Sequence, residues 1–306
     1  MSSTSQSSTS ISVSKRRGFF GFAKPSDSYL WLFFGGCMLL FSLARLEYIA
    51  PEVLRRKIAP GDWFWYNQKF YQVGMQLHLA TVLPSGILSI FQFVPSIRNN
   101  YRQFHRISGR IAFTLLYISM IGALMIAPHA IGGSMSVQSI VWTLSFMTGY
   151  AVFKSWTYIR QRPRRIADHR KWALRAMFYM GSIITARVIM ITAAVITKFV
   201  GTHYTVFRCD EVEFTLNEGN MSNVFSTKYP SCQGVAATSV VPVRADIGGT
   251  IEEIGSALRL SFGAALWLAL TLHAIGVEYY INRTEPNAKR DQPSNSKQSD
   301  PLLKTS

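Results

Sequence analysis

Six long apolar runs constrain the fold of this chain more than any other feature of its sequence. Each is close to the roughly 20 residues that an α-helix needs to cross a lipid bilayer. They lack the regularly spaced polar residues that a core helix of a soluble protein would show. We therefore predict an all-α polytopic membrane protein, a bundle of six transmembrane helices in a lipid bilayer. The predicted spans are residues 29–48, 71–95, 109–128, 137–159, 174–200 and 255–281.

The sequence outside the spans forms two tails and one long loop. Residues 1–28, which begin with a serine-rich segment, and the polar residues 282–306 hold too little apolar surface to order themselves, so we expect disordered tails. The long loop covers residues 201–253 and contains Cys209 and Cys232. We expect these cysteines to form a disulfide in an oxidising compartment and to stiffen an otherwise floppy loop.

The charge distribution predicts the orientation in the membrane. The net charge is +16, but the cations lie in short connections and tails, which is typical of cytosolic segments and gives no reason to expect a nucleic-acid partner. Residues 201–252 instead carry six acids against three Lys and Arg. We therefore expect cytosolic termini, in the plasma membrane or a secretory-pathway membrane. The loop would lie outside or in the lumen, with a glycan on Asn220 of the Asn-Met-Ser sequon.

The connection between the first two spans mixes cations with aromatic side chains. Residues 51–72 contain Trp63, Phe64, Trp65 and Tyr66. Amphipathic aromatics beside cations suit the headgroup region of a bilayer. We therefore expect an interfacial helix in this connection.

A His-Arg motif occurs twice, each time directly before an apolar run. The copies are His105-Arg106-Ile107-Ser108-Gly109-Arg110 and His169-Arg170-Lys171-Trp172-Ala173-Leu174-Arg175. Cations at a helix N-terminus oppose the helix dipole, whereas an anion bound there satisfies both the free N–H groups and the guanidinium groups. The alternative is simple anchoring of a cytosolic helix end to anionic lipid. Topology needs charge but does not need histidine, which favours a site for a small anion or an anionic lipid.

Arg187 is the second candidate site residue, because it lies near the middle of the fifth predicted span. A charged side chain there costs on the order of 3 kcal/mol on insertion scales. The predicted spans offer no Asp or Glu near the membrane midplane. Arg187 must therefore contact carbonyl groups, polar side chains, water or an anionic ligand, and we include it in the predicted ligand site.

The histidines suggest a second function, that of a transmembrane electron carrier with haem b. Such a carrier needs two histidines on different helices at the same depth. An outer pair would be His78 with His129 or His203, and an inner pair would be His273 with His105 or His169. No cluster with the spacing of another metal site occurs in the sequence.

The motif set resembles a family of bacterial and fungal predicted membrane proteins with domains of unknown function. Its members share an intramembrane His and Gln, then HR-x-x-GR, then HR-x-W-x-x-R and an Arg in the next span. The resemblance covers about residues 70–200, and the long cysteine-bearing loop departs from the compact bacterial pattern. It strengthens the choice of site but implies no reaction. The matching positions are His78, Gln92, His105, Arg106, Gly109, Arg110, His169, Arg170, Trp172, Arg175 and Arg187.

These observations together predict a binding or accessory membrane protein rather than an enzyme. Its site would lie on the cytosolic side and would recognise an anionic ligand or lipid. The residues that we expect to form it are Gln92, His105, Arg106, Arg110, His169, Arg170, Trp172, Arg175 and Arg187.

Overall fold

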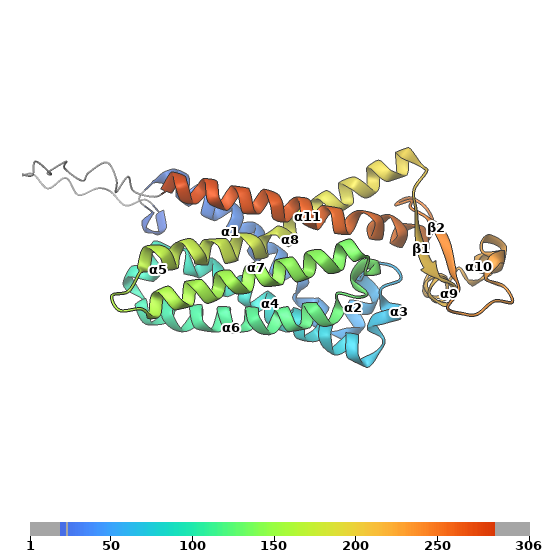
Figure 1. The fold of residues 1–306 in the computed structure, drawn as a ribbon, viewed down its shortest axis with the longest axis horizontal. Coiled ribbons are helices and arrows are strands. Elements are labelled where there is room, and N and C mark those ends of the chain that lie inside the picture. Colours follow the sequence, from blue (N-terminus) through green and yellow to red (C-terminus); the bar gives the residue numbers. More distant parts are fainter. Residues whose placement is uncertain (1–18, 23, 285–306) are drawn as a thin grey trace, which may run out of the picture.

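Long helices dominate the computed structural model of the protein, which describes residues 19–22 and 24–284. They run side by side along the long axis of the molecule (Figure 1). Both the start of α1 and the end of α11 lie at the end of the bundle opposite the small sheet. The long helices are α1 (Pro25–Arg45), α4 (Lys69–Gln92), α6 (Arg102–Ile126), α7 (Met135–Arg160), α8 (Ile166–Val200) and α11 (Ile251–Thr284).

Short helices fill the connections. The connection between the first two spans contains the short helices α2 and α3, and α3 packs against the long loop. The short elements are η1 (Phe19–Gly21), η2 (Leu46–Ile49), α2 (Pro51–Lys57), α3 (Trp63–Tyr66), α5 (Pro95–Asn100) and η3 (Ala130–Gly132).

Five of the long helices in the described part of the chain are both long and apolar enough to cross a membrane, namely α1, α4, α6, α8 and α11. Helix α7 has 26 residues, which is ample length, but no 18-residue stretch of it is as apolar as the best stretch of each of the other five. Its sequence includes Gln138, Ser139, Thr143 and Thr148. It nevertheless runs along the same bundle as the other long helices (Figure 1).

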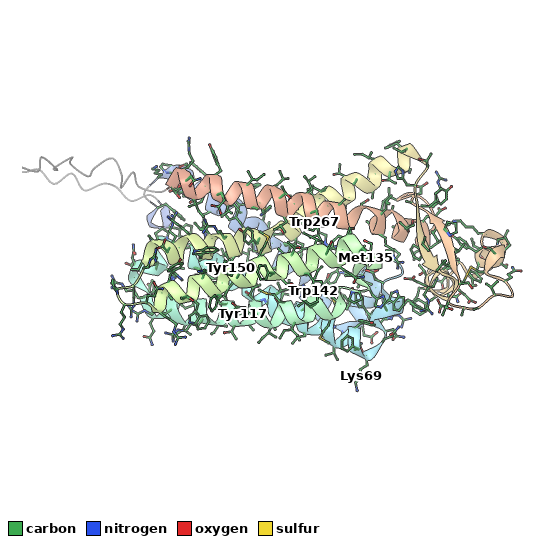
Figure 2. The ribbon with its side chains drawn as sticks, in the orientation of Figure 1. Lys69, Tyr117, Met135, Trp142, Tyr150 and Trp267 are labelled. Atoms are coloured by element: carbon green, nitrogen blue, oxygen red, sulfur yellow. A yellow bond between two sulfur atoms is a disulfide. The ribbon has the colours of Figure 1, made fainter. Side chains whose placement is uncertain are left out.

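The bundle buries small residues and exposes large ones, as a protein surrounded by lipid does. Ala151, Ala186 and Ala269 are fully buried. Phe146 is 73% exposed and Phe199 82% exposed. The labelled tryptophans, methionine and tyrosines in Figure 2 likewise project from the surface of the helices. A contiguous apolar surface of this extent would aggregate in water, so it indicates contact with lipid.

Helices α4 and α6 approach each other most closely at two glycines. A Cβ atom added to Gly122 would lie 2.6 Å from the carbonyl oxygen of Gly74 and 2.6 Å from the backbone nitrogen of His78. Only glycine fits this crossing, which is a common device for packing membrane helices. The crossing fixes His78 against α6.

The long loop is a folded unit, which corrects one expectation. Residues 201–250, which we call the cap, contain a two-stranded antiparallel sheet, so the fold is not entirely α-helical. The cap also has its own apolar core around Phe207, Val212 and Val243, so the disulfide is not alone in ordering it. The predicted disulfide is confirmed, with a Cys209–Cys232 sulfur separation of 2.03 Å. The cap elements are β1 (Tyr204–Arg208), α9 (Cys209–Glu218), α10 (Ser222–Lys228), η4 (Pro230–Cys232) and β2 (Val240–Arg244).

Candidate functional site

Both motif copies lie in the first turns of long helices at the end of the bundle opposite the cap, which we call the basic end. Helix α6 begins at Arg102 and α8 at Ile166, so the prediction that each copy opens a helix is confirmed. Neither helix has a side chain that caps its N-terminal N–H groups. The first turn of α6 has no acid, and Asp168 in α8 is paired with Arg165 at 2.7 Å. The dipoles of both helices therefore add positive potential to this end.

The first copy uses its small residues for packing. Gln92, at the end of α4, donates from Nε2 to the hydroxyl of Ser108 at 2.8 Å. A Cβ atom on Gly109 would lie 2.8 Å from Oε1 of Gln92. The glycine of the motif is therefore needed for the close approach of the Gln92 amide, and Gln92 acts here as a structural contact between α4 and α6.

His169 of the second copy is held between α7 and α8. Its Nδ1 lies 2.9 Å from the carbonyl oxygen of Ser155, and the Ser155 hydroxyl donates to the His169 carbonyl at 3.2 Å. Ser155 is fully buried. This arrangement fixes the ring orientation and leaves Nε2 of His169 without a recorded partner among the described residues.

Arg175 is neutralised within the chain. Its guanidinium donates two hydrogen bonds to Glu278 of α11, at 2.6 and 2.8 Å. It also lies over the ring of Trp172, with 4.5 Å from its central carbon to the ring centroid. A bidentate ion pair stacked on an aromatic ring is a strong helix-to-helix contact. Arg175 and Trp172 therefore join α8 to α11, and a ligand would have to compete with Glu278 for the arginine.

Arg98 and Arg170 lie at the basic end without carboxylate partners among the described residues, and two histidines lie in the same region. His105 lies within electrostatic range of His169, and Arg98 of α5 within range of Arg170. Burial and the charge of Arg170 lower the pKa of Arg98. Nδ1 of His105 is buried without a hydrogen-bond partner. Like charges brought together in this way are destabilising unless an anion lies between them.

Arg170 shows the same excess of positive charge. Its two Nη atoms each lie 3.4 Å from the hydroxyl of Thr284 at the end of α11. A hydroxyl group orients a guanidinium but does not cancel its charge. We call His105, His169, Arg98 and Arg170 the Arg/His centre.

The other two arginines of the first copy lie on a more exposed face of α6 than His105 and Ser108. Arg106 and Arg110 are exposed, whereas His105 and Ser108 on the same helix turns are half-buried or buried. Residues four apart share one face of a helix. The first copy is therefore two-sided, with one face toward the Arg/His centre and the other toward the lipid or solvent.

Arg187 is not brought to the motif copies. It lies twelve residues beyond Arg175, about 18 Å farther along α8 at 1.5 Å per residue. Its guanidinium lies over the ring of Phe262, with 5.1 Å from its central carbon to the ring centroid. It also lies within electrostatic range of Asp62 and Arg45. Arg187 therefore belongs to the half of the bundle nearer the cap.

The histidines considered for haem each have a local environment of their own. Nδ1 of His273 lies 2.7 Å from the Phe178 carbonyl and its Nε2 lies 2.8 Å from the Thr185 hydroxyl, so both ring nitrogens are occupied. The ring of His129 is stacked on Trp65 at 3.6 Å. The remaining two are His78, with Nδ1 3.0 Å from the Ser119 carbonyl, and the exposed His203. The inner pair through His273 therefore has no free nitrogen for iron on that residue.

A buried cluster of charges at the cap end was missed by the sequence reasoning. Arg259 of α11 makes a hydrogen-bonded ion pair with Glu211 of α9, and its Nη2 lies 3.9 Å from Asp62. Trp65 donates from its indole to the same Glu211 carboxylate at 2.9 Å. Asp62 is 1% exposed, Glu211 3% and Arg259 8%. These groups, the cap-end cluster, fasten the cap to the bundle.

The hydrogen bonding of Asp62, a member of this cluster, is incomplete. One carboxylate oxygen accepts a hydrogen bond from the Ile131 N–H at 3.2 Å, and the other is buried near Arg259 without a hydrogen-bond partner. Burial, opposed by the charge of Arg259, raises the pKa of Asp62 to about 7. The carboxyl group is thus close to half protonated at neutral pH.

One feature of the sequence could have indicated this cluster, namely the arginine near the start of the last predicted span. Arg259 lies five residues inside that span, where a charge needs a partner. Its partner Glu211 is 48 residues away in the predicted loop. No local pattern could have paired the two.

The fold and its apolar surface define the class: this is a multi-pass membrane protein with a folded, disulfide-bonded cap. Residues 75–209 match the model of a family described as predicted membrane protein (DUF2306), so this part of the chain is similar to that family. The matched region includes both motif copies and Arg187. The expected resemblance is therefore confirmed.

The chain is also similar to a fungal protein. The chain is 25% identical over 309 residues to "Ava biosynthesis cluster protein G" of Aspergillus versicolor. The comparison covers 86% of this chain and 90% of the relative, so it includes the cap as well as the bundle. No solved structure matches the chain.

Proposed function

We propose that the protein is a six-span binding or accessory membrane protein whose Arg/His centre holds a phosphate-bearing anion on the cytosolic side. The observation that carries the proposal is the excess of positive charge in that centre. Arg98 and Arg170 lie within range of each other, and the described residues supply neither with a carboxylate. A bound anion would satisfy the two guanidinium groups and the uncapped N-termini of α6 and α8 together.

The arrangement of the histidines fits the same ligand. His105 and His169 lie within range of each other beside the arginines, and neutral imidazole N–H groups can donate to phosphate oxygens. Arg175 is not assigned to the ligand, because Glu278 already neutralises it. Arg187 is not assigned to it either, because it lies in the cap-side half of the bundle.

The proposed orientation puts the basic end in the cytosol and the cap outside or in the lumen. Two features support it, the arginine-rich connections at the basic end and the disulfide in the cap. Asn220 is exposed in the cap and is therefore free to carry the proposed glycan. Helix α7 would be the sixth span, since it runs along the bundle beside α8 with enough residues to cross a membrane (Figure 1).

The name of the fungal relative supports an accessory role. That protein is named for a biosynthesis cluster. We infer that the present chain binds its anion in a comparable setting, alongside enzymes that make a small molecule. The proposal assigns no reaction to the chain.

The test is thermal stabilisation of the full-length protein in detergent by inorganic pyrophosphate, with sodium chloride at matched ionic strength as the reference. We expect pyrophosphate to raise the unfolding midpoint of the wild type, because a ligand that binds only the folded state stabilises it. The variant with Arg98→Gln and Arg170→Gln should lose this rise. Arg164→Gln, an exposed cation of the same end of the bundle, is the matched control and should keep it.

Two results would overturn the proposal. One is a wild type that responds to pyrophosphate no more than to chloride. The other is a double variant that keeps the full pyrophosphate effect while it still elutes as a folded species in size-exclusion chromatography.

A further inference from the structure

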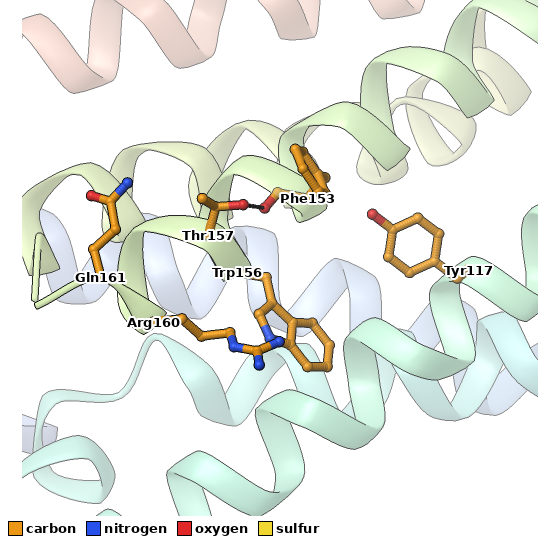
Figure 3. Close-up of a pocket in the computed structure, with 6 residues that line it drawn as sticks. All are labelled: Tyr117, Phe153, Trp156, Thr157, Arg160 and Gln161. Carbon is orange, nitrogen blue, oxygen red and sulfur yellow. Dashed lines mark hydrogen bonds between the residues drawn. The ribbon is translucent and has the colours of Figure 1, made fainter.

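A groove between α6 and α7 lies on the outer face of the bundle, near the basic end. It has a volume of about 480 Å³ and is lined by Tyr117 of α6 and by one stripe of α7. Figure 3 shows Tyr117 at one end of the groove and the polar Arg160 and Gln161 at the other, with aromatic rings between them. The residues on the α7 stripe are Phe153, Trp156, Thr157, Arg160 and Gln161.

The register of the two helices places more cations at the same mouth of the groove. The Tyr117 hydroxyl donates to the Gly149 carbonyl at 2.8 Å, which brings residues 117 and 149 to the same depth. Because α6 and α7 are antiparallel, Arg110 lies level with Trp156, and Arg106 with Arg160. Arg106, Arg110 and Tyr117 also fall on one face of α6 at 3.6 residues per turn.

The three arginines at this mouth are all exposed. Arg106, Arg110 and Arg160 make no hydrogen bond or ion pair with any other described residue. The groove is therefore aromatic and apolar toward the membrane interior and cationic toward the basic end. An amphipathic anion has the complementary distribution, with an apolar chain and a negative head.

We propose that this groove is a binding site for one anionic phospholipid. Its acyl chain would lie along Tyr117 and Phe153, and its phosphate would contact Arg110 and Arg160. An ordinary annular lipid would need the apolar lining but not the unpaired arginines. Guanidinium groups near the membrane surface favour anionic headgroups, by roughly fivefold in affinity for each arginine.

The site is separate from the Arg/His centre. It uses the outward face of the first motif copy, whereas the centre uses the inward face with His105. The inference takes from the proposed function only the orientation that puts the basic end in the cytosol, which assigns the lipid to the cytosolic leaflet. The charge selection itself does not depend on that orientation.

The experiment is native mass spectrometry of the full-length protein in detergent with added phosphatidylserine or phosphatidylcholine. We expect the wild type to retain phosphatidylserine at least tenfold better than phosphatidylcholine. Arg110→Gln with Arg160→Gln should lower phosphatidylserine retention by tenfold or more and leave phosphatidylcholine unchanged. Thr157→Trp, which fills the groove and keeps all charges, should lower the retention of both lipids.

The matched control is again Arg164→Gln, which removes one cation from the same end of the bundle but not from the groove. Equal retention of the two lipids by the wild type would make the groove an annular contact and overturn the inference. So would an equal loss of phosphatidylserine in Arg164→Gln and in the double variant. Pyrophosphate stabilisation, measured on the same groove variants, should stay at the wild-type value, so that a failure here is distinguishable from a failure of the Arg/His centre.

Discussion

The two ends of the bundle differ in whether their buried and half-buried charged side chains are paired within the chain. At the cap end, Arg259 meets Glu211 and Asp62, so cation and anions come from the same chain. At the basic end, Arg98 and Arg170 face each other with His105 and His169 and without a described carboxylate partner. The cap-end cluster is closed within the chain, whereas the Arg/His centre is open to a ligand.

This difference helps to distinguish charged residues that stabilise the fold of a membrane protein from charged residues that bind a ligand. A charge that is fully paired within the chain is explained by packing, and its loss is felt as lost stability. Like charges that have no partner within the chain lower its stability. Their presence is therefore better explained by a function, such as binding an anion. Arg175 illustrates the point within one motif, because its bidentate pair with Glu278 makes it structural although the motif suggested a ligand contact.

The largest effect is expected for Glu211→Gln in the cap-end cluster. The substitution leaves Arg259 buried without its hydrogen-bonded carboxylate, and breaking a buried pair in this way costs about 3 kcal/mol or more. We expect a marked fall in the unfolding midpoint of the detergent-solubilised protein. Glu218→Gln is the control, because its pair with Arg55 is exposed and should contribute little. Equal shifts in the two variants would show that the cluster does not fasten the cap.

The second effect concerns the disulfide that closes the cap. Replacing both Cys209 and Cys232 by serine frees a loop with a sequence separation of 23 residues and should cost about 3 kcal/mol. We expect faster proteolysis of the cap at unchanged cleavage of the bundle. Cys37→Ser, which changes the free cysteine in α1, should leave the cleavage rate of the cap unaltered. A cap that resists protease as well as the wild type would count against this role.

The sequence predicted the long helices of the bundle, because their apolar runs follow from hydropathy alone, and five of them in the described part of the chain are long and apolar enough to cross a membrane. Each predicted span overlaps a long helix, and the motif copies open helices as expected. The helices begin earlier than predicted, at Arg102 rather than residue 109 and at Ile166 rather than residue 174. The polar first turns of α6 and α8 extend beyond the apolar run, where hydropathy gives no signal.

The cap and the pairing of charges could not be predicted in the same way. The cap is polar overall, and its small core depends on contacts between β1, α9 and β2 that no periodic pattern marks. The ion pair of Arg259 with Glu211 and that of Arg175 with Glu278 span 48 and 103 residues of sequence. Such pairs depend on the tertiary arrangement, so the sequence offered Arg175 as a site residue without showing that Glu278 already neutralises it.

A smaller, pH-dependent effect should come from Asp62. Burial, opposed by the charge of Arg259, raises the pKa of Asp62 to about 7 in the folded protein, while the unfolded chain keeps a value of about 4. Between pH 6 and pH 8 the folded protein must release a proton that the unfolded chain has already lost. Stability should therefore fall by roughly 1 kcal/mol over this range as the pH rises.

Asp62→Asn separates this effect from other titrations, because asparagine resembles the protonated acid. We expect the variant to lose most of the decrease between pH 6 and pH 8. The measurement is the unfolding midpoint of the wild type and of the variant at both values of pH. A wild type whose midpoint falls no more steeply than that of Asp62→Asn would contradict the raised pKa.

The smallest effect, and the one of opposite sign, is expected at the Arg/His centre. In Arg98→Gln one of two neighbouring guanidinium charges is lost, which relieves a repulsion of about 0.5 kcal/mol in the protein without its ligand. The unfolding midpoint at low ionic strength should therefore rise slightly, and added sodium chloride should stabilise the variant less than the wild type, since less repulsion remains to be screened. A lower midpoint for Arg98→Gln at every salt concentration would mean that Arg98 is paired within the chain, and the contrast between the open Arg/His centre and the closed cap-end cluster would then disappear.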